Sequence, residues 1–247
     1  MIKRLMRSWD QLARTDPHWA VLTSDDKAGG RWDEAAFFAT GEADVAGVLE
    51  RLAHLGLAVE RTRALDFGCG LGRLTRALGR HFAAVDGVDI SGVMIEQARA
   101  RCPLANVRFV HNPAPDLRCL PEGGYAFVLS LISLQHMPEA VALRYLDGLC
   151  GVLAPGGVAY VQLGTFLAVA DPAARAKLAR DESATNRLYR RLRNLFRRPL
   201  RMDTHYCRLS RVLAVLERRR MEVCTVLPDA SLPPPFVSHV VVFRRPG

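Results

Sequence analysis

Three alternate glycines and two aspartates carry the clearest chemical signal in this sequence. The segment Asp66-Phe67-Gly68-Cys69-Gly70-Leu71-Gly72 places the glycines directly after a short apolar stretch. A turn without side chains lets a ligand approach the backbone and leaves amide groups directed at it. Asp89 follows 17 residues after Gly72, where an acid can accept hydrogen bonds from both hydroxyls of a ribose. Together these residues predict a pocket for an adenosine-type ligand.

Alternating strands and helices must position this pocket. The hydrophobic pattern predicts strands over residues 64–67, 83–90, 107–111, 125–131, 158–163, 222–227 and 239–243, and intervening helices over 71–80, 93–101, 140–153 and 209–220. Helices of about ten residues between strands imply a parallel sheet covered on both faces. The expected fold class is therefore α/β, a doubly wound and mostly parallel sheet, with the pocket at the carboxyl ends of the strands.

The first 61 residues do not show this alternation of strands and helices. Ile2, Leu5, Met6, Trp9 and Leu12 recur at helical spacing, which predicts an amphipathic helix over 2–14, and a second helix is expected from about 44 to 55. We therefore divide the chain into a helical N-terminal cap or lid, 1–61, and a main domain, 62–247, that contains a basic helical insertion, 165–207.

Length and composition exclude several classes of protein. The 247 residues, 49% hydrophobic and 24% charged, are typical of a globular chain and argue against disorder or a coiled coil. No apolar run reaches the roughly 18 residues of a spanning helix, and charged residues interrupt any signal core near the start. The six cysteines show no metal-ligand spacing, so no metal site is expected. We expect a cytoplasmic protein.

At this point the sequence resembles the class I, Rossmann-like, S-adenosylmethionine-dependent methyltransferases over roughly residues 62–163. Four features carry the resemblance in order: the glycine turn, Asp89, Asp116, and the Leu-x-Pro-Gly-Gly turn of residues 153–157. The segment Gln135-His136-Met137-Pro138 is similar to the small-molecule branch of that family. The resemblance implies a seven-stranded sheet whose last strand, 239–243, runs antiparallel, and S-adenosyl-L-methionine as the cofactor.

The family's cofactor contacts map onto particular residues here. The resemblance implies that Asp66 orients the glycine loop and the cofactor's amino group, and that Gly68 and Gly70 lie against the methionine moiety. It implies further that Asp89 holds the ribose and that Ile90 packs on the adenine. Where the family often has an acidic residue and alanine after the third strand, this chain has Pro113-Ala114. The remaining candidates for cofactor contact are Cys69, Gly72, Asn112, the Ala114 amide, Asp116 and Ser130.

Methyl transfer requires mainly alignment and exclusion of water, because the sulfonium already makes the methyl group electrophilic. An acceptor hydroxyl benefits from a base that is neutral near pH 7, and histidine suits that role. His136 is the first candidate, since the resemblance places the transferred methyl just beyond the fourth strand. His111 and His205 are further candidates, and capping the next helix or lining the pocket is the structural alternative for His136.

Some competing functions fit the residues less well. Strand four ends Leu129-Ser130-Leu131-Ile132, without the Asn/Asp-Pro-Pro-aromatic segment of enzymes that methylate exocyclic amines of bases. Arg73 stands where a nicotinamide-binding turn would have its third glycine, which disfavours an oxidoreductase. We expect O-methylation of a small molecule, lipid or glycan precursor. A methyltransferase-like module without turnover, and an RNA methyltransferase, remain alternatives.

Positive charge is concentrated in one segment. Residues 175–220 contain 15 Arg or Lys against four acids, within a chain of net charge +9. An expected helix over 184–198 has an apolar stripe flanked by arginines, which would suit an anionic membrane surface contacted through 184–201. Nucleic-acid or nucleotide phosphates would suit the same charges. A solvated lid helix packed on the main domain explains the pattern equally well.

Overall fold

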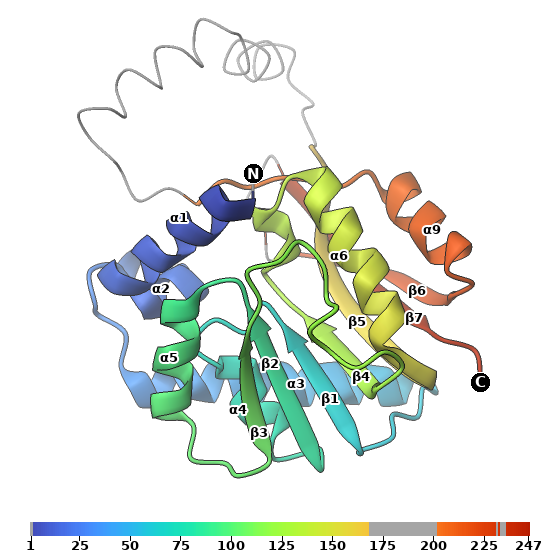
Figure 1. Ribbon diagram of the computed structural model, residues 1–247, viewed down its shortest axis with the longest axis horizontal. Coiled ribbons are helices and arrows are strands. Elements are labelled where there is room, and N and C mark those ends of the chain that lie inside the picture. Colours follow the sequence, from blue (N-terminus) through green and yellow to red (C-terminus); the bar gives the residue numbers. More distant parts are fainter. Residues whose placement is uncertain (1, 168–201, 231, 233–235) are drawn as a thin grey trace, which may run out of the picture.

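A seven-stranded sheet forms the centre of the computed structural model, which describes residues 2–167, 202–230, 232 and 236–247 (Figure 1). The strand order is β3-β2-β1-β4-β5-β7-β6, and β7 runs antiparallel to both of its neighbours. The strands are β1 (Arg63–Phe67), β2 (Ala84–Asp89), β3 (Val107–His111), β4 (Tyr125–Ser130), β5 (Leu153–Leu167), β6 (Glu222–Asp229) and β7 (Phe236–Arg244). The expected α/β class with an antiparallel last strand is confirmed.

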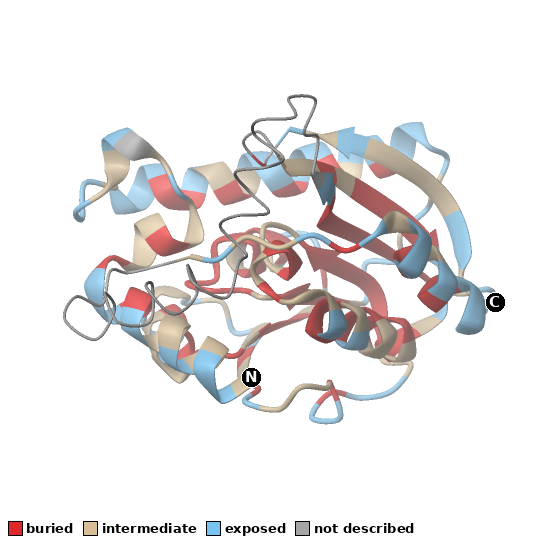
Figure 2. Ribbon diagram, turned by 90° about the horizontal axis from the view of Figure 1, so that it is seen from above, coloured by how far each residue is buried: buried red, intermediate tan, exposed pale blue. Residues whose placement is uncertain are grey.

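Helices cover both faces of this sheet. They are α1 (Ile2–Thr15), α2 (Pro17–Val21), α3 (Glu34–His54), α4 (Arg73–Leu78), α5 (Gly92–Arg101), α6 (Glu139–Val152) and α9 (Leu209–Arg218), with short 3-10 helices at Asp25–Lys27 and Leu134–His136. Successive strand residues point to opposite faces. Leu65 and Phe67 of β1 therefore share a core with α6 and α9, whereas Ala64 shares one with α3 and α4. Figure 2 shows the buried strands between these layers.

Some element boundaries differ from the sequence expectation. Helix α3 begins ten residues earlier than expected, because the Asp33 carboxylate caps it by accepting a hydrogen bond from the Ala36 amide at 2.8 Å, and Phe37 and Phe38 are buried. Strand β5 begins at Leu153, which pairs with Tyr125 of β4 ahead of the Pro-Gly-Gly turn, and it continues to Leu167, because its last residues pair with β7. The other helices and strands of the main domain lie within a few residues of their predicted positions.

The N-terminal segment is fastened to the sheet layer at two places. On α1, Asp10 accepts a hydrogen bond from Ser91 Oγ at 2.7 Å, and the Ala13 carbonyl accepts one from Gln97 Nε2 at 2.9 Å. Helix α3 packs directly on the sheet through a shared apolar cluster that includes Val45. The division at residues 61 and 62 stays a prediction, and the described contacts place α1 and α2 as the part that covers the pocket.

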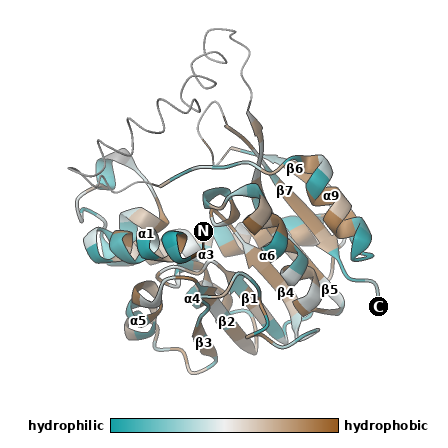
Figure 3. Cartoon of the chain, turned by 45° about the horizontal axis from the view of Figure 1, so that its top comes forward, coloured by the Kyte–Doolittle hydropathy of each residue, from teal (hydrophilic) through white to brown (hydrophobic). Residues whose placement is uncertain are grey.

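The expected helix over 184–198 and the membrane-contact segment 184–201 lie outside the described residues, as does most of the insertion 165–207. Within the described ranges, none of the helices is long and apolar enough to cross a membrane. Figure 3 shows instead that the apolar residues are concentrated in the strands of the sheet.

Candidate functional site

The glycine turn after β1 is held against the end of β2. Gly68, Gly70 and Gly72 have φ values of +77°, +51° and +80°, a region that side chains disfavour. The amides of Gly68 and Cys69 both donate to the Val88 carbonyl, at 2.8 and 3.1 Å. A Cβ atom on Gly68 would overlap Ser133 Oγ, and one on Gly70 would lie 2.6 Å from Val21. The turn therefore requires glycine for close packing as well as for conformation.

Asp89 links this turn to the carboxyl end of β2. One carboxylate oxygen accepts a hydrogen bond from the Gly70 amide at 3.0 Å, and the other accepts one from the Ser91 amide at 2.7 Å. Burial raises the pKa of Asp89, while these hydrogen bonds and the nearby His111 act in the opposite direction. The side chain keeps partial exposure toward the pocket, so its remaining lone pairs can accept hydrogen bonds from a ligand.

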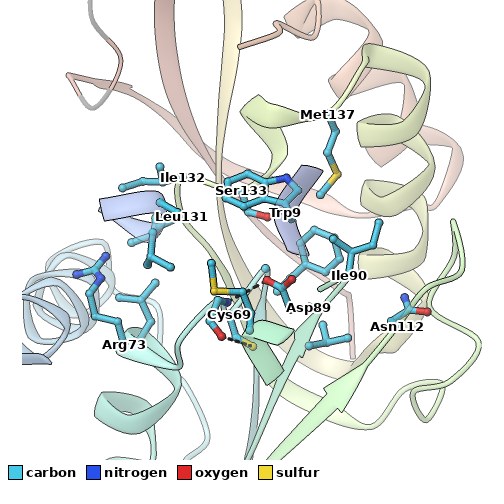
Figure 4. A pocket seen from close by; sticks show the side chains of 18 of the residues that line it. Trp9, Cys69, Arg73, Asp89, Ile90, Asn112, Leu131, Ile132, Ser133 and Met137 are labelled. Atoms are coloured by element: carbon cyan, nitrogen blue, oxygen red, sulfur yellow. Dashed lines mark hydrogen bonds between the residues drawn. The ribbon is translucent and has the colours of Figure 1, made fainter. Parts of the chain in front are cut away.

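A pocket opens above the turn, and its walls come from both parts of the chain (Figure 4). The N-terminal cap contributes Trp9 from α1 together with Ala20 and Val21 from α2. The main domain contributes mostly apolar side chains around the glycines, which are Phe67, Cys69, Leu74, Val88, Asp89, Ile90, Met94, Asn112, Leu131, Ile132, Ser133, Met137, Tyr145 and the stem of Arg73. An apolar chamber with an acid at one edge fits a nucleoside: bases need apolar walls, and ribose hydroxyls need an acceptor.

Asp66 and Ser130 lie beneath the pocket, outside its lining. Asp66 is buried and accepts a hydrogen bond from Thr75 Oγ1 of α4 at 2.6 Å. Burial raises the pKa of this carboxyl to about 6. Ser130 is fully buried at the end of β4, and its hydroxyl has no hydrogen-bond partner among the described residues. Direct cofactor contact by either residue stays a prediction.

The loop after β3 satisfies most of its own polar groups. Asn112 lines the pocket, but its side chain accepts from the Ala114 amide at 3.2 Å and donates to the Asp116 carbonyl at 2.7 Å. The Asp116 carboxylate pairs with Arg118 and Arg144. The structure thus brings Asn112 to the cofactor side and directs Asp116 to surface arginines. The replacement of the lost adenine acceptor by Asn112 or Asp116, with the Ala114 amide retained, stays a prediction.

The backbone of Ile132, in the wall of the first pocket, is strained, and the buried side chain of Gln162 supports it. Ile132, directly after β4, has φ +54°, which is rare for a β-branched residue. Its amide donates to Gln162 Oε1 of β5 at 2.8 Å, and Gln162 in turn donates to Gln135 Oε1 at 2.9 Å. Gln162 is 1% exposed. In the sequence, the only signal for this support is a polar residue, Gln162, within the otherwise apolar stretch 158–163.

Arg73 is a second residue whose place the sequence did not reveal. It begins α4, is 3% exposed and lines the pocket with its stem. Its guanidinium turns toward α3, where it donates to Thr40 Oγ1 at 3.1 Å and pairs with Asp44 at 2.5 Å. Arg73 therefore connects α3 to the floor of the first pocket.

A second pocket adjoins the first across Trp9, which lines both. His136 lies here rather than in the first pocket, with its ring against Trp9 at a centroid distance of 5.3 Å. Because Nδ1 lies 3.1 Å from the Asp203 carbonyl, an acceptor, that nitrogen carries the proton, and the Nε2 lone pair faces the Gln135 Nε2 donor at 3.4 Å. Burial lowers the pKa of His136, so the neutral ring is favoured.

The other candidate bases are placed differently. His205 lines the second pocket together with His136, and burial lowers its pKa. His111 lies behind Ile90, whose carbonyl is 3.1 Å from its Nε2, and it lines neither pocket. Among the described residues no group of histidines, cysteines and acids could hold a metal ion.

The seven-stranded sheet with its glycine turn after β1 is the Rossmann-like methyltransferase fold. Residues 64–157 match the family model described as a methyltransferase domain, so the resemblance predicted from the sequence is confirmed. Over 98% of this chain, the fold is similar to magnesium protoporphyrin IX methyltransferase from Synechocystis PCC 6803, whose structure holds bound SAH. The TM-score is 0.62, the identity is 17%, and 99% of that chain is covered.

Curated relatives match part of the chain. A trans-aconitate 2-methyltransferase of Methylobacterium radiotolerans is 34% identical over 139 residues, covering 56% of this chain and 51% of the relative. A ubiquinone biosynthesis O-methyltransferase of Psychrobacter arcticus is 32% identical over 44% of this chain and 42% of its own length. A malonyl-[acyl-carrier protein] O-methyltransferase of Halorhodospira halophila is 36% identical over 59% and 48%. The matches thus span about half of these relatives or less.

Proposed function

We propose that the protein uses S-adenosylmethionine to methylate an oxygen of a small molecule. The observation that carries this proposal is the position of Asp89, a partly exposed carboxylate at the carboxyl end of β2. It accepts a hydrogen bond from the Gly70 amide at 3.0 Å and faces an apolar pocket. The glycine cradle fits a bulky ligand lying against the backbone, and Ile90 and Met94 offer apolar walls for a base.

Each wall of the first pocket has a part in holding the cofactor. Asp89 would accept hydrogen bonds from the ribose hydroxyls, and the turn of Gly68 and Gly70 would lie against the amino-acid end. When bound, the cofactor supplies an electrophilic methyl group on sulfur. Trp9, Ala20 and Val21 close the pocket from the cap side and limit access of water. The chain's contribution is alignment more than covalent chemistry.

The second pocket would hold the acceptor, with His136 as the base. A neutral imidazole with Nδ1–H directed at the Asp203 carbonyl keeps Nε2 as an acceptor. An acceptor hydroxyl would replace the 3.4 Å contact of Nε2 with Gln135 Nε2 and donate its proton there. Trp9 separates this ring from the first pocket and would lie beside the path of the methyl group. The relatives' names support an oxygen acceptor, since two of the three specify an O-methyltransferase.

Calorimetric titration with S-adenosylhomocysteine tests the cofactor assignment. The unmodified protein should bind it, and NADH and NADPH should not bind. Asp89→Ala should weaken binding at least tenfold, because it removes the ribose acceptor, and Asp89→Asn should lie between them, because one acceptor oxygen remains. Circular dichroism of each variant shows whether it is folded. Equal affinity of the folded Asp89→Ala variant would contradict the proposal.

A second measurement tests the base. With an acceptor found by screening with labelled S-adenosylmethionine, His136→Ala should lower turnover about 10²–10⁴-fold. Its affinity for S-adenosylhomocysteine should change less than twofold. Because burial lowers the pKa of His136, the rate should rise with pH to a plateau through a midpoint below 6.5. His81→Ala, at an exposed histidine outside both pockets, is the matched control. Unchanged turnover in His136→Ala would exclude this base.

A further inference from the structure

The second pocket contains a cation without a partner. Arg4 of α1 lines this pocket, and among the described residues no hydrogen bond or ion pair engages its guanidinium. Arg7, one turn away on another face of α1, instead donates to the Lys3 carbonyl and lines neither pocket. An arginine presents five donors in a planar fork that matches a carboxylate or phosphate. Arg4 is therefore available to a ligand in the pocket.

The face of α1 that lines the pocket has a polar outer end and an apolar inner end. Its lining residues are Arg4, Leu5, Ser8, Trp9 and Leu12, a spacing that places all five on one side of the helix. Arg4 and Trp9 are separated by about 7.5 Å along the helix axis, from a rise of 1.5 Å per residue. Because helical side chains lean toward the N-terminus, the guanidinium lies farther still from the first pocket.

The opposite wall restricts where an anion can lie. It carries His136 and His205, both favoured as neutral rings because burial lowers the pKa of each, and Asp203. With both rings neutral, this wall supplies no positive charge, so an anionic group is favoured beside α1, near Arg4 and Ser8. Pro138 and Met202 add apolar surface between the two polar walls.

From this arrangement we infer that the second pocket selects an acceptor with an anionic group at the end opposite the methylated oxygen, bound by Arg4. The inference rests on the proposed function and adds the substrate class to it. The acceptor is a short molecule with an apolar middle, its hydroxyl or carboxyl oxygen near His136 and Trp9, and a carboxylate or other anion one to two helical turns away. The anionic group bound by Arg4 is distinct from the oxygen that receives the methyl group.

Binding of paired probes tests the assignment. The probes are ω-hydroxy acids and dicarboxylic acids of four to eight carbons, each paired with the neutral amide of its terminal acid group, titrated into the protein saturated with S-adenosylhomocysteine. We expect at least one acid to bind tenfold or more tightly than its amide. In Arg4→Gln this ratio should fall to about one, and in Arg4→Lys it should be partly restored. Arg7→Gln, with the same charge change on the same helix, should keep the ratio.

The outcomes separate this inference from the proposed function. If no acid binds more tightly than its amide, or if Arg4→Gln keeps the ratio, the inference is wrong although S-adenosylhomocysteine still binds. If Arg4→Gln and Arg7→Gln lower the ratio equally, the effect is long-range charge and the site at Arg4 is excluded. Failure of the unmodified protein to bind S-adenosylhomocysteine would instead overturn the proposed function itself. Arg4 is exposed, so its substitution leaves the core intact.

Discussion

At the residue scale, the first pocket depends on a buried side chain, Gln162, that supports the pocket wall without lining the pocket. Gln162 holds the Ile132 amide and thereby a backbone conformation that isoleucine disfavours. It also donates to Gln135, whose Nε2 lies 3.4 Å from His136 Nε2. One amide on β5 thus connects the wall of the first pocket to the candidate base in the second.

Replacing the Gln162 side chain should weaken cofactor binding although Gln162 does not line the first pocket. We expect Gln162→Leu to lower stability by about 1–3 kcal/mol, since the buried Ile132 amide loses its acceptor. Affinity for S-adenosylhomocysteine should also fall several-fold. Ser238→Ala removes another hydrogen bond of Gln162 but leaves the Ile132 contact, so it should keep that affinity. Chemical unfolding and calorimetry measure both effects. Equal affinity losses in the two variants would refute a specific role for Ile132.

The buried carboxyl of Asp66 makes stability depend on pH in an unusual direction. Its pKa is raised from 3.8 to about 6, so its contribution to stability is fully present below pH 3.8 and is lost as pH rises through 6. Asp66→Asn should therefore gain stability relative to the unmodified protein between pH 4 and pH 7, by up to about 3 kcal/mol. Urea unfolding at the two pH values measures the difference.

Asp86 provides a control of opposite sign. Hydrogen bonds from Arg108, Tyr125 and Arg63 outweigh its burial and lower its pKa, so its stabilising effect is present above pH 3.8 and lost as pH falls. The loss of stability caused by Asp86→Asn should therefore be larger at neutral pH than at acid pH. If both variants responded to pH in the same direction, the burial of Asp66 would not be the cause.

The sequence predicted the part of the site that lies at the ends of two adjacent parallel strands. The glycine turn, Asp89 and Ile90 form one corner of the pocket, because the turn and the end of an adjacent parallel strand must meet. The roles of Arg4 and Gln162 were not predicted. Their positions depend on how α1 and β5 pack, and a side chain's neighbours in space leave little trace in its own segment.

At the element scale, predictions were accurate where glycines or a clear period mark the ends. Strand β3 and helix α5 begin and end within one residue of expectation. The start of α3 was missed because the contrast between its two faces is weak there: the exposed residues include Ala35, Ala36 and Ala39, and the buried ones include Gly41.

Helix α2 gives Gly70 a second reason to be glycine. Gly70→Ala should cost about 1–2 kcal/mol for its left-handed backbone, and more because its Cβ would lie 2.6 Å from Val21. Displacement of α2 should also weaken binding of S-adenosylhomocysteine. Gly56→Ala has φ +70° but open space around its Cβ, so only the backbone cost applies. Thermal unfolding and calorimetry compare the two, and equal effects would show that α2 does not press on the turn.

At the scale of the whole molecule, the cap and the sheet share their cores. Val45, Val48 and Leu52 of α3 pack in one cluster with residues of β1, β2, β4, β5 and β7, and Leu71 of the glycine turn packs in another with α1 and α3. The N-terminal residues therefore gain much of their buried surface from the main domain, and a cap separated from it would lose that surface.

Unfolding should accordingly occur in one step for both parts. All three tryptophans lie in the first 32 residues, so their fluorescence reports on the cap, whereas circular dichroism reports on the whole chain. We expect the two urea transitions to coincide. S-adenosylhomocysteine at 100 times its dissociation constant should stabilise both by about 2.7 kcal/mol. A fluorescence transition that precedes the dichroism transition would show that the cap unfolds independently.

The position of α1 has a practical consequence for handling the protein. The helix starts at Ile2, and its third residue, Arg4, already lines the second pocket, so residues fused ahead of Ile2 would emerge beside that pocket's rim. The carboxyl end follows β7 on the other side of the molecule (Figure 1). Affinity tags and surface attachments therefore belong at the carboxyl end, where they leave the entrance for small molecules open.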